Sequence, residues 1–281
     1  SNNPAGRAEG LELDSSEVRE PPLFTGRFLL LLVVQLAFGF GFSSFFILPK
    51  FMAVQLGADA GTIGQVTAMF GLVSVCVTPI VGAQIDGFGR KPLVLLGTAF
   101  MSLSALGFLL VDRVGPLLYL LRGLQGIAFT VGFSAMATLV ADLAPPARLG
   151  RALGVFGAAM LVTNGLAPNL LEPVADSSGW APVFLSSAAA SAVAFLISFV
   201  LVEPEHREHS VPGAGEPAAF PLRRLTPILV AATTAGSAFG TILTFYQPFA
   251  LSLGIDRVSG FFMGFTAAAL AARIFLGGLA D

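Results

Sequence analysis

The stretch Gly82-Ala-Gln-Ile-Asp-Gly-Phe-Gly-Arg-Lys-Pro92 joins two long apolar runs of the chain. Its glycines permit a tight turn because glycine has no Cβ atom, and Pro92 suits the first turn of a helix that follows. Arg90 and Lys91 place two positive charges in the turn, as is typical of a loop on the cytoplasmic side of a membrane. The stretch therefore predicts two membrane-crossing helices with a short cytoplasmic connection.

The composition of the whole chain agrees with a membrane protein. Of its 281 residues, 55% are hydrophobic and 11% are charged, whereas soluble domains carry about a quarter charged residues. The mean hydropathy is +0.83, and a soluble fold of this composition would lack a charged surface. The net charge of −2 gives no basic footprint for nucleic acid, so the expected surroundings are a lipid bilayer.

Eight apolar runs each approach the ~20 residues that a helix needs to cross the hydrocarbon core. They show no period-2 alternation, and the backbone groups of a lipid-embedded segment must be satisfied within the segment, so we expect an all-α bundle of polytopic membrane helices. The expected spans are residues 28–49, 62–85, 92–111, 116–141, 152–171, 181–202, 225–251 and 258–280, with Arg122 and Arg273 as their only charged residues.

Lysine and arginine are distributed unequally between the loops. A cytoplasmic N-terminus puts ten of them on the cytoplasmic side and three outside, the three being Lys50, Arg113 and Arg257. This excess predicts a cytoplasmic N-terminus in a plasma (inner) membrane.

The chain divides into four predicted regions. Residues 1–27 are polar and acidic and are expected to form a disordered cytoplasmic tail. Residues 28–202 hold six spans, residues 203–224 read as a polar cytoplasmic linker, and residues 225–281 start a second membrane domain. Leu56-Gly57 recurs as Leu253-Gly254, and the pattern G-x-x-x-D at the end of the second span recurs at the end of the chain. The repeat predicts a truncated second domain.

Two motifs resemble the major facilitator superfamily. The stretch 82–92 resembles its loop signature G-x-x-x-D-x-x-G-R-[RK], and Arg122-Gly-Leu-Gln-Gly126 resembles its R-x-x-Q-G signature. The resemblance implies a fold of twelve spans, of which this chain would hold eight, in a protein expected to be a monomer.

The resemblance also implies a conformational latch at the cytoplasmic end. Its residues would be Gly82, Asp86, Gly89, Arg90 and Lys91, with Arg90 paired to Asp142 at the end of the fourth span. Asp86 would face the N-terminal end of a helix in the other domain, where the helix dipole is positive.

Polar residues inside spans are candidates for a substrate cavity or for ion coupling. Arg122 is costly in lipid and should face a cavity, unless it reaches the outer interface; Gln125 follows on the same helix face. Two roles are equally consistent with the position of Arg273: it faces the central cavity, or it supports the cytoplasmic end of its helix. The uncharged candidates, each of which also fits a hydrogen bond between helices, are Gln35, Asn164, Tyr246 and Gln247.

The function that the resemblance implies is secondary active transport of a small solute by alternating access. We expect efflux of an amphipathic or drug-like compound driven by a proton gradient; the alternatives are uptake of a sugar, amino acid or organic acid, and a non-transporting sensor or scaffold. Two features weaken the expectation of proton antiport. Ala167-Pro168 departs from the glycine-proline signature of the family's antiporters, and no buried Asp or Glu is expected in spans 1 to 6.

The sequence predicts neither an enzyme nor a cofactor-binding or metal-binding protein. The patterns G-x-x-x-x-G-K-[ST], H-E-x-x-H and G-x-S-x-G do not occur. His206 and His209 lie in the polar linker, where two histidines are insufficient for a metal site. The single cysteine, Cys76, excludes an internal disulfide. The expected partners are a small-molecule substrate, protons and the bilayer.

Overall fold

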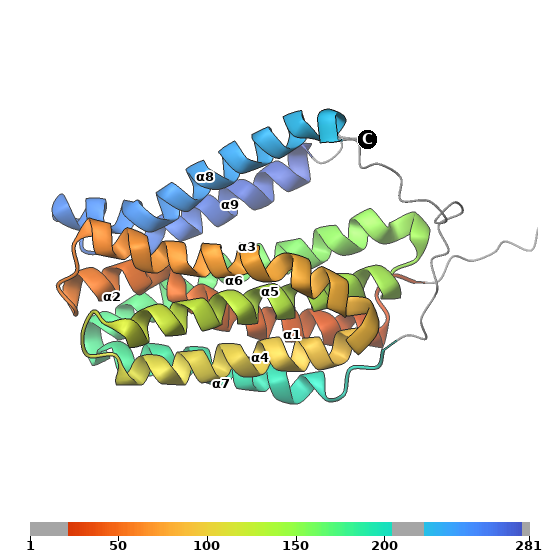
Figure 1. Ribbon diagram of the computed structural model, residues 1–281, viewed down its shortest axis with the longest axis horizontal. Coiled ribbons are helices and arrows are strands. Elements are labelled where there is room, and N and C mark those ends of the chain that lie inside the picture. The colour runs from red at the N-terminus through yellow and green to blue at the C-terminus, as the bar shows by residue number, and fades with distance from the viewer. Residues whose placement is uncertain (1–21, 204–221, 277–281) are drawn as a thin grey trace, which may run out of the picture.

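The computed structural model describes residues 22–203 and 222–276, which form helices joined by short loops (Figure 1). Most of the predicted tail, most of the predicted linker and the second copy of the loop motif, residues 277–281, lie outside the described residues. The helices are α1 (Gly26–Ser43), η1 (Ser44–Ile47), α2 (Leu48–Val54), α3 (Ala60–Phe88), α4 (Arg90–Gly107), η2 (Phe108–Leu110), α5 (Pro116–Leu143), η3 (Pro146–Arg148), α6 (Leu149–Ser178), α7 (Trp180–Ser198), α8 (Leu222–Ser252) and α9 (Gly260–Leu276).

Seven helical segments in the described part of the chain are long and apolar enough to cross a membrane. The first combines α1, η1 and α2 over Gly26–Val54, and the others correspond to α3, α4, α5, α6, α7 and α8. The eighth predicted span, 258–280, is represented by α9, whose 17 described residues are too few to meet that length. The described residues thus make an integral membrane protein with seven spans and a shorter apolar helix.

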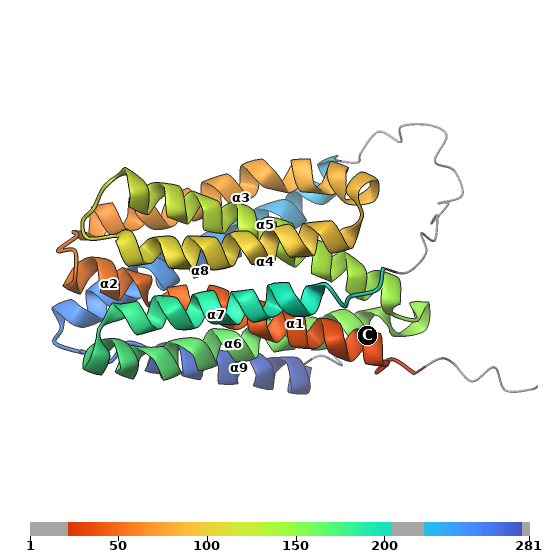
Figure 2. The ribbon, with the colours of Figure 1, turned by 90° about the horizontal axis from the view of Figure 1, so that it is seen from below.

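The helices α1 to α7, which make six membrane spans because α1 and α2 belong to one, form one bundle. α3 packs on α5, α5 on α4, α4 on α7, α7 on α1, and α1 on α6, and Figure 2 shows α7, α1 and α6 side by side. The buried apolar side chains of this bundle form two main clusters, one around Phe38 and Met136 and the other around Phe45 and Phe184. We call α1 to α7 the six-helix unit.

Small residues bring the helices of this unit close together. A Cβ atom at Gly97 of α4 would lie only 2.4 Å from the Cα atom of Gly132 in α5. On the neighbouring face, the hydroxyl of Ser187 in α7 donates a hydrogen bond of 2.7 Å to the carbonyl of Gly41 in α1. Small residues let helix backbones approach in this way in membrane proteins.

Equivalent turns follow the first and the seventh predicted spans. Gly57 has φ +62° and Gly254 has φ +77°, a left-handed conformation that glycine adopts without strain. Each turn leads into the next membrane helix, which Asp59 caps in the first case by accepting the N–H of Thr62 at 2.7 Å. This bond lowers the pKa of the Asp59 carboxyl. The two turns thus share a left-handed glycine.

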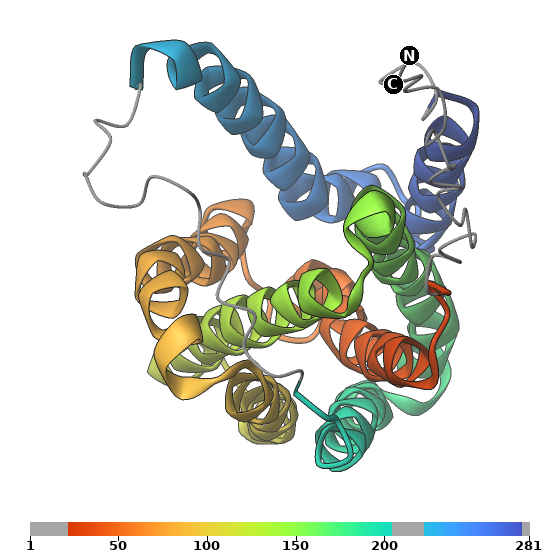
Figure 3. The same ribbon diagram turned by 90° about the vertical axis from the view of Figure 1, so that its right-hand side faces the viewer.

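The helix α9 runs along the six-helix unit, whereas α8 meets the unit at one end. α9 packs along α6, and α8 contacts α2 and α3. Towards the end where α3 turns into α4, α8 diverges from the unit (Figures 1 and 3). We call this end, which holds Gly89 and Glu203, the motif end, and the opposite end, which holds the α8–α9 loop, the Lys50 end.

Two boundaries differ from the prediction. Lys50, expected in an outer loop, lies inside α2 and is buried, and α6 continues past residue 171 to Ser178. The extension includes Glu172, which is fully buried, so the expectation of no buried Asp or Glu in spans 1 to 6 is wrong. A hydropathy pattern ends a predicted span at a charged residue. In the structure the charges of Lys50 and Glu172 form an ion pair, so both residues lie within helices.

Candidate functional site

The turn between α3 and α4 contacts the chain that follows α7. Gly89 has φ +82°, and a Cβ atom at this position would lie 3.0 Å from the carboxylate oxygens of Glu203. The backbone N–H of Arg90 donates to Oε1 of Glu203. Glycine at position 89 therefore serves both the backbone conformation and the approach of this carboxylate.

The side chains of Arg90 and Lys91 hold three segments together at the motif end. Nε of Arg90 lies 3.1 Å from Oδ2 of Asp142 at the end of α5, which is the pairing that the resemblance implies. Nζ of Lys91 donates to the carbonyl of Phe199 at 2.7 Å. Gly82 is exposed in α3, and Asp86 lies in the same helix, with its side chain outside the described part. The sequence assigned Glu203 to the linker and missed its contact with this turn.

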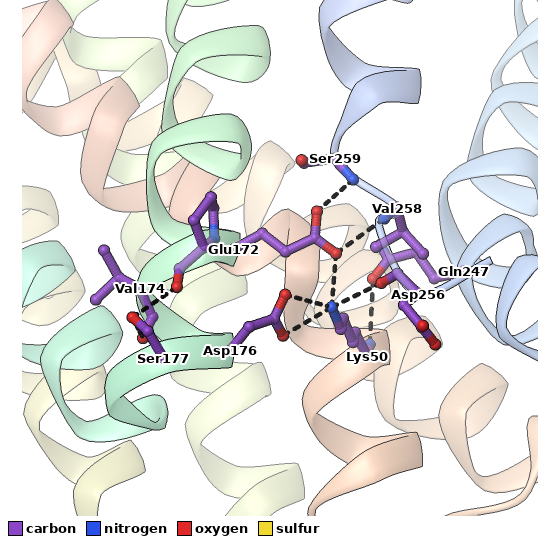
Figure 4. A network of polar contacts seen from close by, with 10 residues as sticks. Lys50, Glu172, Val174, Asp176, Ser177, Gln247, Asp256, Val258 and Ser259 are labelled. Atoms are coloured by element: carbon purple, nitrogen blue, oxygen red, sulfur yellow. Dashed lines mark hydrogen bonds and ion pairs between the residues drawn. The ribbon is translucent and has the colours of Figure 1, made fainter. Parts of the chain in front are cut away.

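A buried ionic network occupies the opposite end (Figure 4). Nζ of Lys50 lies 2.8 Å from Oε1 of Glu172 and 2.9 Å from Oδ1 of Asp176. It also donates to the backbone carbonyl of Asp256 at 2.8 Å. The side chains of Lys50 and Glu172 are 6% and 0% exposed, whereas that of Asp176 is 53% exposed.

The same network joins the six-helix unit to α8 and α9. The two carboxylate oxygens of Glu172 accept the N–H groups of Val258 and Ser259, at 2.8 and 2.6 Å, just before α9 begins. The side chain of Gln247 in α8 accepts the N–H of Lys50 at 3.1 Å and donates to the carbonyl of Phe46. We call Lys50, Glu172, Asp176, Gln247 and the backbone of 256–259 the Lys50 network.

Sequence reasoning missed most of this network. One signal was available, because Glu172 and Asp176 are four residues apart and so share a helix face. Their partner Lys50 is 122 residues away from Glu172 in the sequence, and no spacing rule connects the two. Gln247, a candidate for the cavity, instead forms part of the Lys50 network.

A large cavity lies between the six-helix unit and α8–α9. Its volume is about 880 Å³, within the range of about 300–1,000 Å³ that is usual for sites of small molecules. Nine phenylalanines line it, among them Phe42, Phe70 and Phe129 of the six-helix unit and Phe239, Phe245 and Phe262 of α8 and α9. Leu48 and Pro49 also line it, so the Lys50 network begins at the next residue along the chain.

The polar side chains of the cavity are few. Asn164 is one of them, and its Oδ1 accepts the hydroxyl of Ser43 at 2.7 Å. Arg122 is another; it is 8% exposed, and its Nη1 donates to Oε1 of Gln125 at 2.7 Å. The guanidinium carbon lies 5.1 Å from the centroid of the Phe70 ring, within cation–π distance.

The remaining candidates do not line this cavity. Gln35 is buried and donates to the sulfur of Met160 at 3.5 Å. Tyr246 stacks on Phe261 with ring centroids 4.4 Å apart. Arg273 is exposed, and its Nη1 donates to the carbonyl of Gly154 in α6 at 3.2 Å.

A model of the Major Facilitator Superfamily matches residues 29–281 of the chain. The chain belongs to this family. It spans about two fifths of the length of the curated relatives that it matches, and their aligned parts cover between a half and two thirds of this chain.

Three such relatives are named for resistance or efflux. Multidrug resistance protein 1 of Bacillus subtilis is 28% identical over 59% of this chain and 42% of its own length. The class G tetracycline resistance protein of Vibrio anguillarum is 28% identical over 61% of this chain and 43% of its own. The homologue of the multidrug efflux pump PmrA from Lactococcus lactis is 32% identical over 57% and 41%.

Two solved structures share the fold. The xylose transporter XylE from E. coli, in an inward open conformation, superposes with a TM-score of 0.53 at 14% identity over 81% of this chain and 56% of its own. Tetrameric PepTSo2 superposes with a TM-score of 0.52 at 17% identity over 81% and 51%. At these identities the likeness establishes the fold alone.

Proposed function

We propose that the protein to which this chain belongs exports a small amphipathic compound across the plasma membrane by alternating access. The phenylalanine-lined cavity carries this proposal. It is large enough for a drug-sized molecule, and rings that can rearrange around different apolar bodies suit a site for chemically varied compounds.

The two ends of the six-helix unit fit alternating access. In the predicted orientation the Lys50 network lies at the outer end, just beyond the cavity, and the turn at Gly89 lies at the cytoplasmic end. The described state is closed by polar contacts at the Lys50 end, while α8 diverges from the unit at the motif end. A cycle would require the Lys50 network to separate and the motif end to close, as in transporters whose two halves rock around a central site.

The Arg90–Asp142 pair is proposed to act in the conformational latch. The pair connects the α3–α4 turn to the end of α5. The turn is thereby held in one position, in which it is proposed to contact the second domain. Gly82, Asp86 and Lys91 are proposed to act with it.

Export is favoured over uptake by the names of the sequence relatives, which refer to drug resistance and efflux. A proton gradient is the proposed source of energy. Among the described Asp and Glu side chains, Glu172 is the one that is fully buried in a span, and buried carboxylates in membrane spans are frequent proton carriers.

The test is transport by the intact protein in liposomes. The vesicles contain the native protein and are loaded with N-phenyl-1-naphthylamine, a neutral fluorescent amphipath. They should lose or gain the dye faster with an imposed pH gradient than without one. A protonophore should abolish the difference. Dye movement that equals that of protein-free vesicles, for this dye and for an anionic relative of it, would contradict the proposal.

A further inference from the structure

Of the described residues that line the cavity, Arg122 alone carries a charged side chain. It enters the cavity from the first turns of α5, and more than nine tenths of it is buried. A guanidinium remains protonated at neutral pH and offers five N–H donors.

These donors are only partly used. Nη1 donates to Gln125, whereas Nε is buried and has no hydrogen-bond partner in the described part of the chain. The Phe70 ring faces the guanidinium but accepts no conventional hydrogen bond. A buried donor that finds no acceptor carries an energetic cost, so the arrangement is incomplete without another acceptor.

The positive charge is also unbalanced. Among the described side chains, no carboxylate forms an ion pair with Arg122. The carboxylates of the Lys50 network, Glu172 and Asp176, are bound to Lys50 instead. An isolated charge in apolar surroundings is unfavourable, and an arriving anion would relieve that cost.

We propose that Arg122 binds the anionic group, a carboxylate or a sulfonate, of an aromatic amphipath whose apolar body rests on the phenylalanines of the cavity. The inference deepens the proposed function and rests on it, because it assigns a substrate class to the same cavity. Gln125 is a positioning residue, since its Oε1 accepts a hydrogen bond from Nη1 while Nε has no partner among the described residues. A planar guanidinium matches the two oxygens of a carboxylate or sulfonate.

Two dyes with the same body test the proposal. 1-Anilinonaphthalene-8-sulfonate carries a sulfonate, and N-phenyl-1-naphthylamine has the same phenyl and naphthyl groups without it. The affinity of the intact protein in lipid nanodiscs for each dye is measured by equilibrium dialysis against empty nanodiscs. We expect the sulfonate to bind at least about tenfold more tightly, a difference of about 1.4 kcal/mol.

Three variants and one control variant separate charge recognition from a structural role. Arg122→Gln should lower the ratio of sulfonate to amine affinity by about tenfold, and Arg122→Lys should restore part of it. Gln125→Glu leaves Arg122 in place but puts a carboxylate beside Nη1, so it should lower the ratio as well. Arg113→Gln, which removes an exposed arginine before α5, should leave the ratio unchanged.

The outcomes are distinct. A native ratio near one, or an equal loss of affinity for both dyes in Arg122→Gln and Gln125→Glu, overturns the inference, since a structural arginine would affect both dyes alike. If the amine is transported in liposomes without any preference for the sulfonate, the inference fails and the proposed export stands. If neither dye is moved by the native protein, the proposed function fails.

Discussion

Lys50 and Glu172 form an ion pair of 2.8 Å in which the carboxylate is fully buried and also accepts two backbone N–H groups in front of α9. The pair therefore connects α2 and α6 to the loop between α8 and α9. A buried charge whose partner is removed is unfavourable by about 3–5 kcal/mol, so this contact is suited to hold one end of the bundle closed.

The first prediction concerns this closure. Glu172→Gln removes the charge opposite Lys50 and should shift the intact protein towards separation at the Lys50 end. The measurement is labelling of Thr67→Cys, a cavity position, by a membrane-impermeant maleimide from outside, in a Cys76→Ser background. The labelling rate should rise by about tenfold or more.

Asp176→Asn is the matched control for the first prediction. Asp176 contacts the same Nζ but is 53% exposed, and solvent-exposed ion pairs contribute only about 0–1 kcal/mol. Its labelling rate should change far less than that of Glu172→Gln. Equal rates in the native protein and in Glu172→Gln would mean that the ion pair does not hold the closure.

The second prediction concerns the proposed latch. Arg90→Ala separates Asp142 from its cation, and Asp86→Asn removes the charge that the family motif places in α3. Both should lower the initial rate of dye transport by about tenfold while membrane insertion, followed by the amount of protein in the membrane fraction, is retained. Arg151→Ala removes an exposed arginine near the same end and should transport normally. Unchanged rates in both latch variants would refute the proposed role.

The third prediction concerns helix packing. Gly97→Ala forces a methyl group to within 2.4 Å of the Gly132 Cα atom, and the contact is with backbone, which cannot rotate away. Overpacking of this kind costs about 1–3 kcal/mol. The midpoint of thermal unfolding in detergent should fall, whereas Gly154→Ala, where a Cβ atom meets nothing within 4 Å, should leave it unchanged or raise it. A Gly97→Ala protein as stable as Gly154→Ala would contradict the close α4–α5 contact.

The fourth prediction concerns orientation. The excess of lysine and arginine places the predicted linker, 203–224, in the cytoplasm, so Ser210→Cys in intact cells should resist the impermeant maleimide until the membrane is permeabilised. Ser177→Cys, an exposed position at the Lys50 end of α6, should react from outside. The reverse pattern would show that the charge rule assigns the wrong side for this chain.

The sequence by itself determined the membrane class and the approximate positions of the membrane helices, and its resemblance to the family implied the pairing of Arg90 with Asp142. These features follow from local causes. Lipid requires long apolar helices, and the loop motif carries its own glycines and charges, of which Gly89 has the positive φ that such a turn needs.

Only the tertiary structure decided which polar residues meet. Lys50 and Glu172 appear at the edges of apolar runs as loop charges, and they become a buried pair only when α2, α6 and the α8–α9 loop converge. Glu203 reaches Arg90 across 113 residues of chain, and Gln247 lies at the closure rather than in the cavity. The physical reason is that the energy of a buried polar group depends on partners supplied by distant segments, and hydropathy along a single helix contains no information about them.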